Sequence, residues 1–190
     1  MYKKIIFSSI EKCIKELKQN GIIIYPTEAV FGLGCNPESK TAVKKLIILK
    51  NRSPNKGFIL IAANYDQLKS YVADDKISAF QRNYMFSRWP GHVTFIVPTL
   101  PKTPKWIIGN FDSVAIRISK NPYVRKLCTK FGKPIISTSA NLSNQNPCRT
   151  FEDVVKQFGQ SFPILFGSTC GLKHPSEIRN IITGDLIRQG

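Results

Sequence analysis

Several polar segments of this sequence directly follow apolar runs, and their residue types suit the binding of an anionic ligand. The first begins with Thr27 and Glu28, just after the apolar run 22–25. A hydroxyl and a carboxylate at the end of a strand can contact a ligand, and glycines at 32 and 34 would let the backbone approach it closely. On this segment alone, a purely structural turn is an equally good interpretation.

A cluster of cations lies between residues 50 and 56, where the sequence contains Lys50, Arg52 and Lys56. Lysine offers a compact charge to a phosphate and arginine offers a planar fork, so the cluster suits a polyphosphate. Taken by itself, a solvated run of charges is the better interpretation.

Hydroxyl and amide groups end a later apolar run, at Ser137, Ser139 and Asn141. These side chains could contact phosphate or ribose closely, or they could form an Asx-type turn. Arg117 lies within the apolar run 114–118, where a buried guanidinium needs an anionic partner. A substrate carboxylate is one candidate for that partner, and Glu28 is the structural alternative.

Common nucleotide, metal and nucleophile motifs are absent from the sequence. It contains no GxGxxG and no GxxxxGK[ST], so neither a Rossmann fingerprint nor a P-loop is supported. Its two histidines, His92 and His174, are interpreted as loop residues and are too few for a metal cluster or a Ser-His-Asp triad. The five cysteines are widely spaced without a CxxC pair, which argues against a zinc site or a disulfide framework.

The chain is strongly basic, with 28 Lys and Arg against 12 Asp and Glu and a formal net charge of +16. This balance indicates an anionic partner such as nucleic acid, a nucleotide or a membrane surface, although solubility alone could explain it. No apolar run approaches the ~18 residues that suggest a transmembrane helix, and the N-terminus lacks the apolar stretch of a signal peptide. With the cysteine pattern, this predicts a soluble, cytoplasmic protein.

The elements that must position these residues alternate between helical and strand patterns. A capping-box spacing from Ser8 to Glu11 predicts a first helix that ends near Gly21. Other helices are expected at 39–50, 66–72, 76–88, 122–131 and from 150. In the helix 76–88, Ile77, Phe80 and Tyr84 are expected to face inward. Strands are expected at 22–25, 58–62, 93–97, 113–118, 134–138, 164–166, 178–182 and 186–188. We therefore predict a single α/β domain with a twisted, open, mixed sheet whose strand order is not predicted.

The joint order of these motifs resembles the YrdC/TsaC family, in its short bacterial form. The resemblance extends from Ile5 to Gly190, which we take as one domain, 5–190. It rests on these motifs in order: Tyr25-Pro26-Thr27-Glu28-Ala29-Val30-Phe31-Gly32-Leu33-Gly34, Lys50-x-Arg52, Trp89-Pro90-Gly91-x-x-Thr94, Ser139-Ala140-Asn141, Pro175-Ser176-Glu177-Ile178-Arg179 and Arg188-x-Gly190.

The resemblance implies a threonylcarbamoyl-AMP synthase, a nucleotidyltransferase that joins L-threonine, bicarbonate or CO2, and ATP and releases pyrophosphate. It also implies a concave, positively charged hollow and a downstream threonylcarbamoyl transferase complex that modifies tRNA beside the anticodon, and it leaves open whether tRNA binds this chain directly. Lys50 and Arg52 would be catalytic, and threonine would bind to Thr27, Arg117 and Ser137. Mg²⁺ would arrive on ATP, with no metal ligand from the protein. The implied ATP ligands are Lys50, Arg52, Lys56, Ser113, Ser139, Asn141, Cys148, Ser176 and Arg188.

The sequence departs from the family pattern at a few positions. Ser53 follows Arg52 where proline is frequent, His92 replaces the second proline of Pro-Gly-Pro, and Asn144 stands where glycine is common. Ala29 occupies a position where longer relatives often carry a second threonine. The main alternative is a non-catalytic RNA-binding protein, although no RNA-module signature is present. A carbamoyl-transfer module of the hydrogenase-maturation type would need accessory domains for which 190 residues leave no room.

Overall fold

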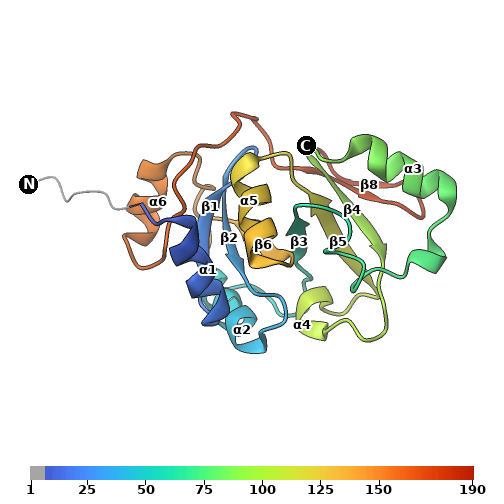
Figure 1. The fold of residues 1–190 in the computed structure, drawn as a ribbon, viewed down its shortest axis with the longest axis horizontal. Coiled ribbons are helices and arrows are strands. Elements are labelled where there is room, and N and C mark those ends of the chain that lie inside the picture. The colour runs from blue at the N-terminus through green and yellow to red at the C-terminus, as the bar shows by residue number, and fades with distance from the viewer. Residues whose placement is uncertain (1–6) are drawn as a thin grey trace, which may run out of the picture.

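The structure is a computed structural model that describes residues 7–190, so the expected domain start at Ile5 lies outside the described residues. One sheet runs through the molecule, and helices cover both of its faces (Figure 1). A short 3₁₀ helix, Asp74–Lys76, precedes α3. The other elements are α1 Ile10–Lys18, β1 Ile23–Pro26, β2 Phe31–Cys35, α2 Lys40–Lys50, β3 Ile59–Ala62, α3 Ala79–Arg88, β4 Val93–Pro98, α4 Lys105–Ile108, β5 Ser113–Ile118, α5 Pro122–Phe131, β6 Ile135–Ser139, α6 Phe151–Phe158, β7 Glu177–Asn180 and β8 Leu186–Arg188.

The sheet has eight strands in the order β1-β2-β6-β3-β5-β4-β7-β8. The pairs β3–β5 and β4–β7 are parallel, and the other neighbours are antiparallel. The sheet is therefore open and mixed, which confirms the predicted fold class. Because β6 inserts between β2 and β3, the Ser139 end of β6 lies beside the Gly32 end of β2.

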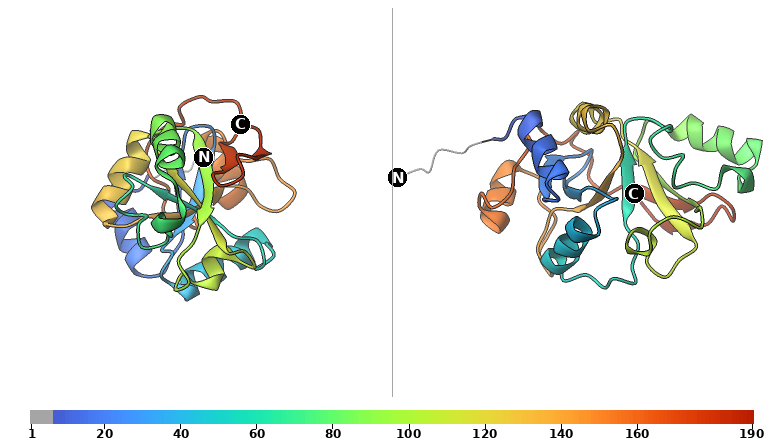
Figure 2. Two further views of the ribbon diagram at one scale, coloured as in Figure 1. Left: turned by 90° about the vertical axis from the view of Figure 1, so that its right-hand side faces the viewer. Right: turned by 60° about the horizontal axis from the view of Figure 1, so that its bottom comes forward.

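Alternating apolar residues divide the core between the two faces of the sheet. Ile23 and Tyr25 pack in one hydrophobic cluster, together with the inward faces of α1 and α5. Ile24 packs in the other cluster, which includes the inward faces of α2 and α6. The left view of Figure 2 shows α1 and α5 together on one side of the sheet. This period of two is what a strand covered on both faces requires.

Local capping signals explain most helix boundaries. Asn121 caps α5, Pro122 occupies its first turn, and Gly132 closes it with φ of 82°. The first helix differs from its prediction, because Ser9 rather than Ser8 provides the N-cap. Ser8 instead forms a β-bridge with Leu165, which uses its backbone outside the helix.

Three further element predictions are wrong. Residues 66–72 form successive turns, because the Tyr71 carbonyl accepts from Leu100 N and Thr99 Oγ1 instead of continuing a helix. The predicted helix 76–88 begins only at Ala79, and Phe80 of its predicted stripe is 82% exposed, whereas Ile77 is buried ahead of the helix and Met85 is buried within it. Residues 164–166 make only isolated bridges, to Ser8 and to Ile24 in β1.

Strand β2 was not predicted as a strand, because its alternate glycines carry no apolar signal. It forms a hairpin with β1, in which Tyr25 pairs with Gly32. A Cβ at Gly34 would lie 2.7 Å from the Tyr25 ring and 2.8 Å from the Ile136 carbonyl oxygen. Gly34 is therefore required by packing rather than by close approach to a ligand.

The five cysteines are free thiols, and Cys170 is the exposed one. Among residues 7–190, no helix has both the length and the apolar character that crossing a membrane demands.

Candidate active site

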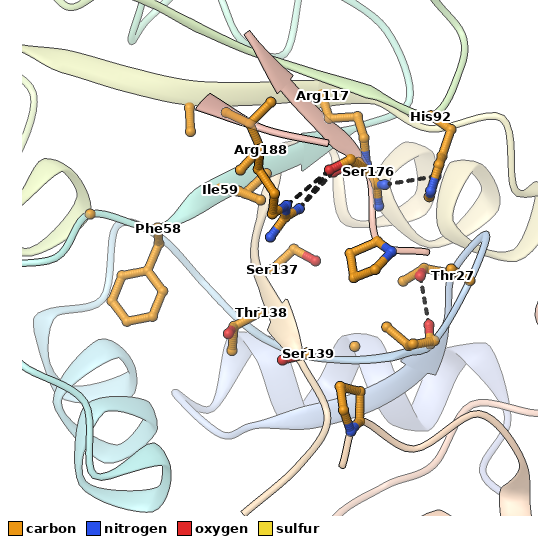
Figure 3. A pocket seen from close by; sticks show the side chains of 18 of the residues that line it. Thr27, Phe58, Ile59, His92, Arg117, Ser137, Thr138, Ser139, Ser176 and Arg188 are labelled. Carbon is orange, nitrogen blue, oxygen red and sulfur yellow. Dashed lines mark hydrogen bonds between the residues drawn. The ribbon is translucent and has the colours of Figure 1, made fainter. Parts of the chain in front are cut away.

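A hollow of about 340 Å³ opens on the face of the sheet that carries Ala115, Arg117 and Ser137 (Figure 3). Its volume falls within the range of small-molecule sites. Segments from the whole length of the chain meet in it, from the β1–β2 loop to β8. The predicted site residues that line it are Thr27, Arg52, Arg117, Ser137, Ser139, Ser176 and Arg188.

The lining is positively charged. Arg52, Arg117 and Arg188 all contribute to it, and no Asp or Glu is among the described residues that line it. Arg188 donates to the Ser176 carbonyl at 2.8 Å and to Ser176 Oγ at 3.2 Å. Arg52 donates to the Gly57 carbonyl at 2.6 Å, and its guanidinium lies 4.9 Å from the Phe58 ring centroid. Guanidinium groups fixed in this way form a preorganised site for a polyanion.

Lys50 lies directly behind the lining, at the end of α2. Its Nζ donates to the carbonyl oxygens of Ser139 and Asn141 at 2.9 and 2.7 Å, and to Asn141 Oδ1 at 2.7 Å. Ser139 Oγ donates to the same Oδ1 at 2.7 Å. Burial, followed by repulsion from Arg52, lowers the pKa of Lys50 to about 8. Lys50 and the Ser139–Asn141 segment, separate in the sequence, therefore form one hydrogen-bonded unit.

Besides Lys50 and Asn141, three more predicted ATP ligands lie outside this lining. Lys56 is exposed. Ser113 lines a neighbouring, mainly apolar hollow of about 150 Å³ that shares Phe58 and Ala115 with the main one. Cys148 is fully buried, and its backbone bonds to Ala140 and Phe31 hold the wall in place. Their roles as nucleotide ligands stay predictions.

Arg117 is paired with Glu28, which was the structural alternative for its partner. Arg117 Nη2 lies 3.2 Å from Glu28 Oε2, and both side chains are almost fully buried. Glu28 Oε1 accepts from Ser119 Oγ at 2.7 Å and from Lys120 N at 3.0 Å. Burial opposes ionisation of Glu28, but Arg117 and these hydrogen bonds outweigh it and lower the pKa of the carboxyl. Arg117 Nε is buried without a hydrogen-bond partner. The residue lines the hollow, and the ion pair with Glu28 leaves other N–H groups of its guanidinium for a ligand.

Two hydroxyls near Arg117 have defined hydrogen-bonding roles. Thr27 Oγ1 donates to the Val30 carbonyl at 2.6 Å, which leaves its lone pairs to accept from a ligand. Ser137 Oγ accepts from the Tyr25 hydroxyl at 2.8 Å, which leaves its own proton to be donated. Beside the arginine, these hydroxyls suit a small ligand that carries a carboxylate, a donor and an acceptor.

His92 lies in the loop before β4, as interpreted, but it also lines the hollow. One ring nitrogen, Nε2, lies 2.8 Å from the His174 carbonyl, and Nδ1 lies 3.5 Å from Arg117 Nη1. The available signal was its position after Gly91, where it departs from the family's proline. The residue types alone did not predict that the His92 imidazole lies against the Arg117 guanidinium.

The described residues contain no group of three or more His, Cys, Asp or Glu side chains that could together hold a metal ion. The expectation that Mg²⁺ arrives with ATP stays a prediction.

Comparison with known proteins agrees with the motif order. A family model for Sua5, YciO and YrdC proteins, described as telomere recombination, matches residues 15–190. The chain is 53% identical over 182 residues to the threonylcarbamoyl-AMP synthase of Enterobacter sp. (strain 638), with 96% of each chain covered. It is 52% identical over 188 residues to that of Buchnera aphidicola subsp. Schizaphis graminum (strain Sg), with 99% of each covered.

The fold is also that of solved relatives. A crystal structure of P. abyssi Sua5 complexed with L-threonine superposes with a TM-score of 0.83 at 26% identity, over 90% of this chain and 50% of that one. This chain thus corresponds to about half of the longer archaeal protein. With the family model and the curated relatives covering nearly its whole length, the chain belongs to the Sua5/YciO/YrdC family.

Proposed function

We propose that this chain is a threonylcarbamoyl-AMP synthase that supplies threonylcarbamoyl-adenylate for the modification of tRNA. The observation that carries this proposal is one hollow that combines three guanidinium groups with a hydroxyl-lined seat beside Arg117. A nucleoside triphosphate needs the cationic surface and a small amino acid needs the hydroxyl-lined seat, and a reaction between them needs the two next to each other.

In this proposal L-threonine lies beside Arg117, Thr27 and Ser137. Its carboxylate pairs with the guanidinium of Arg117 through N–H groups that Glu28 does not occupy. The Ser137 hydroxyl donates to an oxygen of the ligand, and Thr27 Oγ1 accepts from its hydroxyl or amine. The P. abyssi Sua5 structure is a complex with L-threonine, which supports an amino-acid site in this fold.

ATP, with Mg²⁺ as its counter-ion, places its phosphates between Arg52, Arg188 and the unit formed by Lys50 and Ser139–Asn141. The neighbouring apolar hollow around Phe58 and Ser113 offers room for the less polar part of the nucleotide. Positive charge on three sides neutralises the phosphates without a protein nucleophile.

The reaction proceeds in two steps. The threonine amine adds to CO2, which forms a carbamate and releases a proton to solvent. A carbamate oxygen then attacks the α-phosphorus of ATP in line, a phosphorus–oxygen bond forms, and the bond to the bridging oxygen breaks to release pyrophosphate. Such a displacement depends mainly on positioning and on stabilising charge, which matches a site built from cations and hydroxyls.

Pyrophosphate release tests the proposal directly. Purified protein is incubated with ATP, Mg²⁺, bicarbonate and L-threonine, and pyrophosphate is measured with each component omitted in turn. We expect release that requires both threonine and bicarbonate, with serine as a control amino acid. ATP hydrolysis that is indifferent to threonine, or no turnover together with RNA binding, would contradict the synthase and favour the non-catalytic alternative.

A further inference from the structure

Residues 167–175, here called the strap, run beside the β1–β2 loop on the way to β7. Cys170 N donates to the Thr27 carbonyl at 3.3 Å, and Leu172 N donates to the Glu28 carbonyl at 3.2 Å. The Arg149 guanidinium donates to the carbonyls of Leu172 and Lys173. The strap is thus tied to the same loop that carries Thr27 and Glu28, and Pro175 at its end lines the hollow.

His92 connects the strap to Arg117 through the two nitrogens of its ring. A carbonyl oxygen can only accept, so the 2.8 Å contact with His174 O requires that Nε2 carries the ring proton. In the neutral ring, Nδ1 then carries a lone pair, and it faces Arg117 Nη1 at 3.5 Å. Figure 3 shows this contact beside Ser176 and Arg188.

Arg117 is consequently held from two directions. Glu28 Oε2 lies 3.2 Å from Nη2, and the His92 ring accepts from Nη1. These two contacts leave Nε without a partner. The orientation of the guanidinium, and so the direction of its remaining N–H groups, is set by Glu28 on one side and by the tautomer and charge of His92 on the other.

We propose that neutral His92 is a positioning residue that orients Arg117 toward the substrate carboxylate and links this orientation to the strap. The inference rests on the proposed function for the identity of the substrate, and it adds a residue whose identity departs from the family pattern. His92 touches neither reacting atom. It acts through Arg117 on one side and through the His174 carbonyl on the other.

The charged groups that face His92 are Arg117 from β5 and Glu28 from the β1–β2 loop, while the strap contributes the carbonyls of His174 and Pro175. Burial, opposed by the His174 carbonyl and reinforced by Arg117, lowers the pKa of His92 below its ordinary value. Protonation places an N–H on Nδ1, where it meets the N–H and positive charge of Arg117. Threonine binding should therefore be intact at neutral pH and weaken as the pH falls through the lowered pKa of His92.

Two amide substitutions separate the two contacts of the ring. His92→Asn places an acceptor near the position of Nδ1 but does not reach the strap, whereas His92→Gln keeps a donor near the position of Nε2 and loses the acceptor. We expect His92→Gln and His92→Ala to raise KM for threonine about fivefold, the factor of one lost hydrogen bond, with a smaller change in kcat. His92→Asn should stay closer to wild type, and its KM should lack the rise at acidic pH.

Equal KM values in the Asn, Gln and Ala variants, or an acid rise that persists in His92→Asn, would overturn the proposal. A second readout does not depend on turnover. His174→Asn removes the only other imidazole and keeps its carbonyl, so the ring ¹⁵N shifts of His92 can be followed alone by NMR.

We expect the Nε2–H tautomer in the NMR experiment, and a His92 titration that moves to lower pH when threonine is added. The Nδ1–H tautomer, or a titration that threonine does not move although calorimetry shows threonine binding, would contradict the positioning role. Absence of pyrophosphate release by wild-type protein, with the expected tautomer present, would instead contradict the proposed function.

Discussion

Lys50 illustrates how one side chain can belong both to the scaffold and to a proposed reaction. Its three hydrogen bonds all end on the Ser139–Asn141 segment, so its ammonium group helps to hold that segment in place. Arg52 is less occupied, because it has one hydrogen bond to Gly57 and a buried Nε without a partner. In the proposed reaction Arg52 contacts the phosphates from the lining, whereas Lys50 acts through its charge and by shaping the Ser139–Asn141 segment.

At the residue scale, we expect Lys50→Ala and Arg52→Ala each to lower kcat/KM for ATP at least tenfold. Loss of a charge-assisted hydrogen bond costs ~1.5–3 kcal/mol, and ~1.4 kcal/mol is a factor of ten in rate. Steady-state kinetics of pyrophosphate release provide the measurement. Lys44→Ala is the matched control, because Lys44 is an exposed cation on the same helix.

Lys56→Ala makes a sharper comparison at the same scale. Lys56 belongs to the same run of cations in the sequence but does not line the hollow. Its substitution should therefore cost less than that of Arg52. Equal losses at positions 44, 52 and 56 would show that the cluster acts only through general surface charge.

At the scale of elements, Asn121 connects the start of α5 to the loop that carries Thr27. Its Oδ1 accepts from Tyr123 N at 2.9 Å and caps the helix, while its Nδ2 donates to the Thr27 carbonyl at 3.0 Å. Asn121 is fully buried. One amide thus satisfies a helix end and fixes the entry of the β1–β2 loop.

We expect Asn121→Ala to lower the free energy of unfolding by ~1–2 kcal/mol and to raise KM for threonine, because both the cap and the loop contact are lost. Asn121→Ser keeps a capping oxygen and should recover part of the stability while KM stays high. Chemical denaturation and kinetics measure the two effects separately.

Ser78→Ala is the control for Asn121, since it removes the capping box of α3 at the far end of the molecule. It should lower stability without changing KM. If KM for threonine follows stability in all three variants, Asn121 has no specific role in the loop.

The elements that could be predicted from the sequence are those whose signals are local. Strand β5 and the boundaries of α5 follow from apolar runs and from an Asn-Pro start with a Gly stop. Strand β2 could not be recognised, because its strand character comes from Tyr25 packing over Gly32 and Gly34. The failed helix at 66–72 has the same cause, since a distant segment takes up its Tyr71 carbonyl.

The sequence predicted which residues line the site better than it predicted the contacts between them. Motif order pointed to the arginines and hydroxyls that line the hollow, but two partners for Arg117 remained open until Glu28 was found 3.2 Å away. His92 was missed because its role depends on a carbonyl and a guanidinium supplied by other segments. Contacts of this kind are set by the tertiary fold, and no local pattern encodes them.

At the scale of the whole molecule, the net charge of +16 exceeds what three arginines in a hollow require. If tRNA binds this chain directly, the excess cations provide a sequence-independent attraction to its phosphates. We expect such binding to weaken at least about tenfold between ~50 and ~200 mM salt, as counterion release predicts. Filter binding or fluorescence anisotropy across a salt series provides the measurement, and an affinity that does not change with salt would remove tRNA from the partners.

The position of β6 between β2 and β3 has a consequence for the synthesis of the protein. Tyr25 and Ser137 touch although they are 112 positions apart, and Arg188 enters the hollow from the last strand. At ~5–20 residues per second, a ribosome needs on the order of 10 s to make β6 after β1. During that time the edge of β2 that pairs with β6 stays open, and the hollow has not yet formed in the nascent chain. A chain truncated before β8 would close that edge with β6, but it would lack Arg188 in the hollow and would leave the outer edge of β7 unpaired.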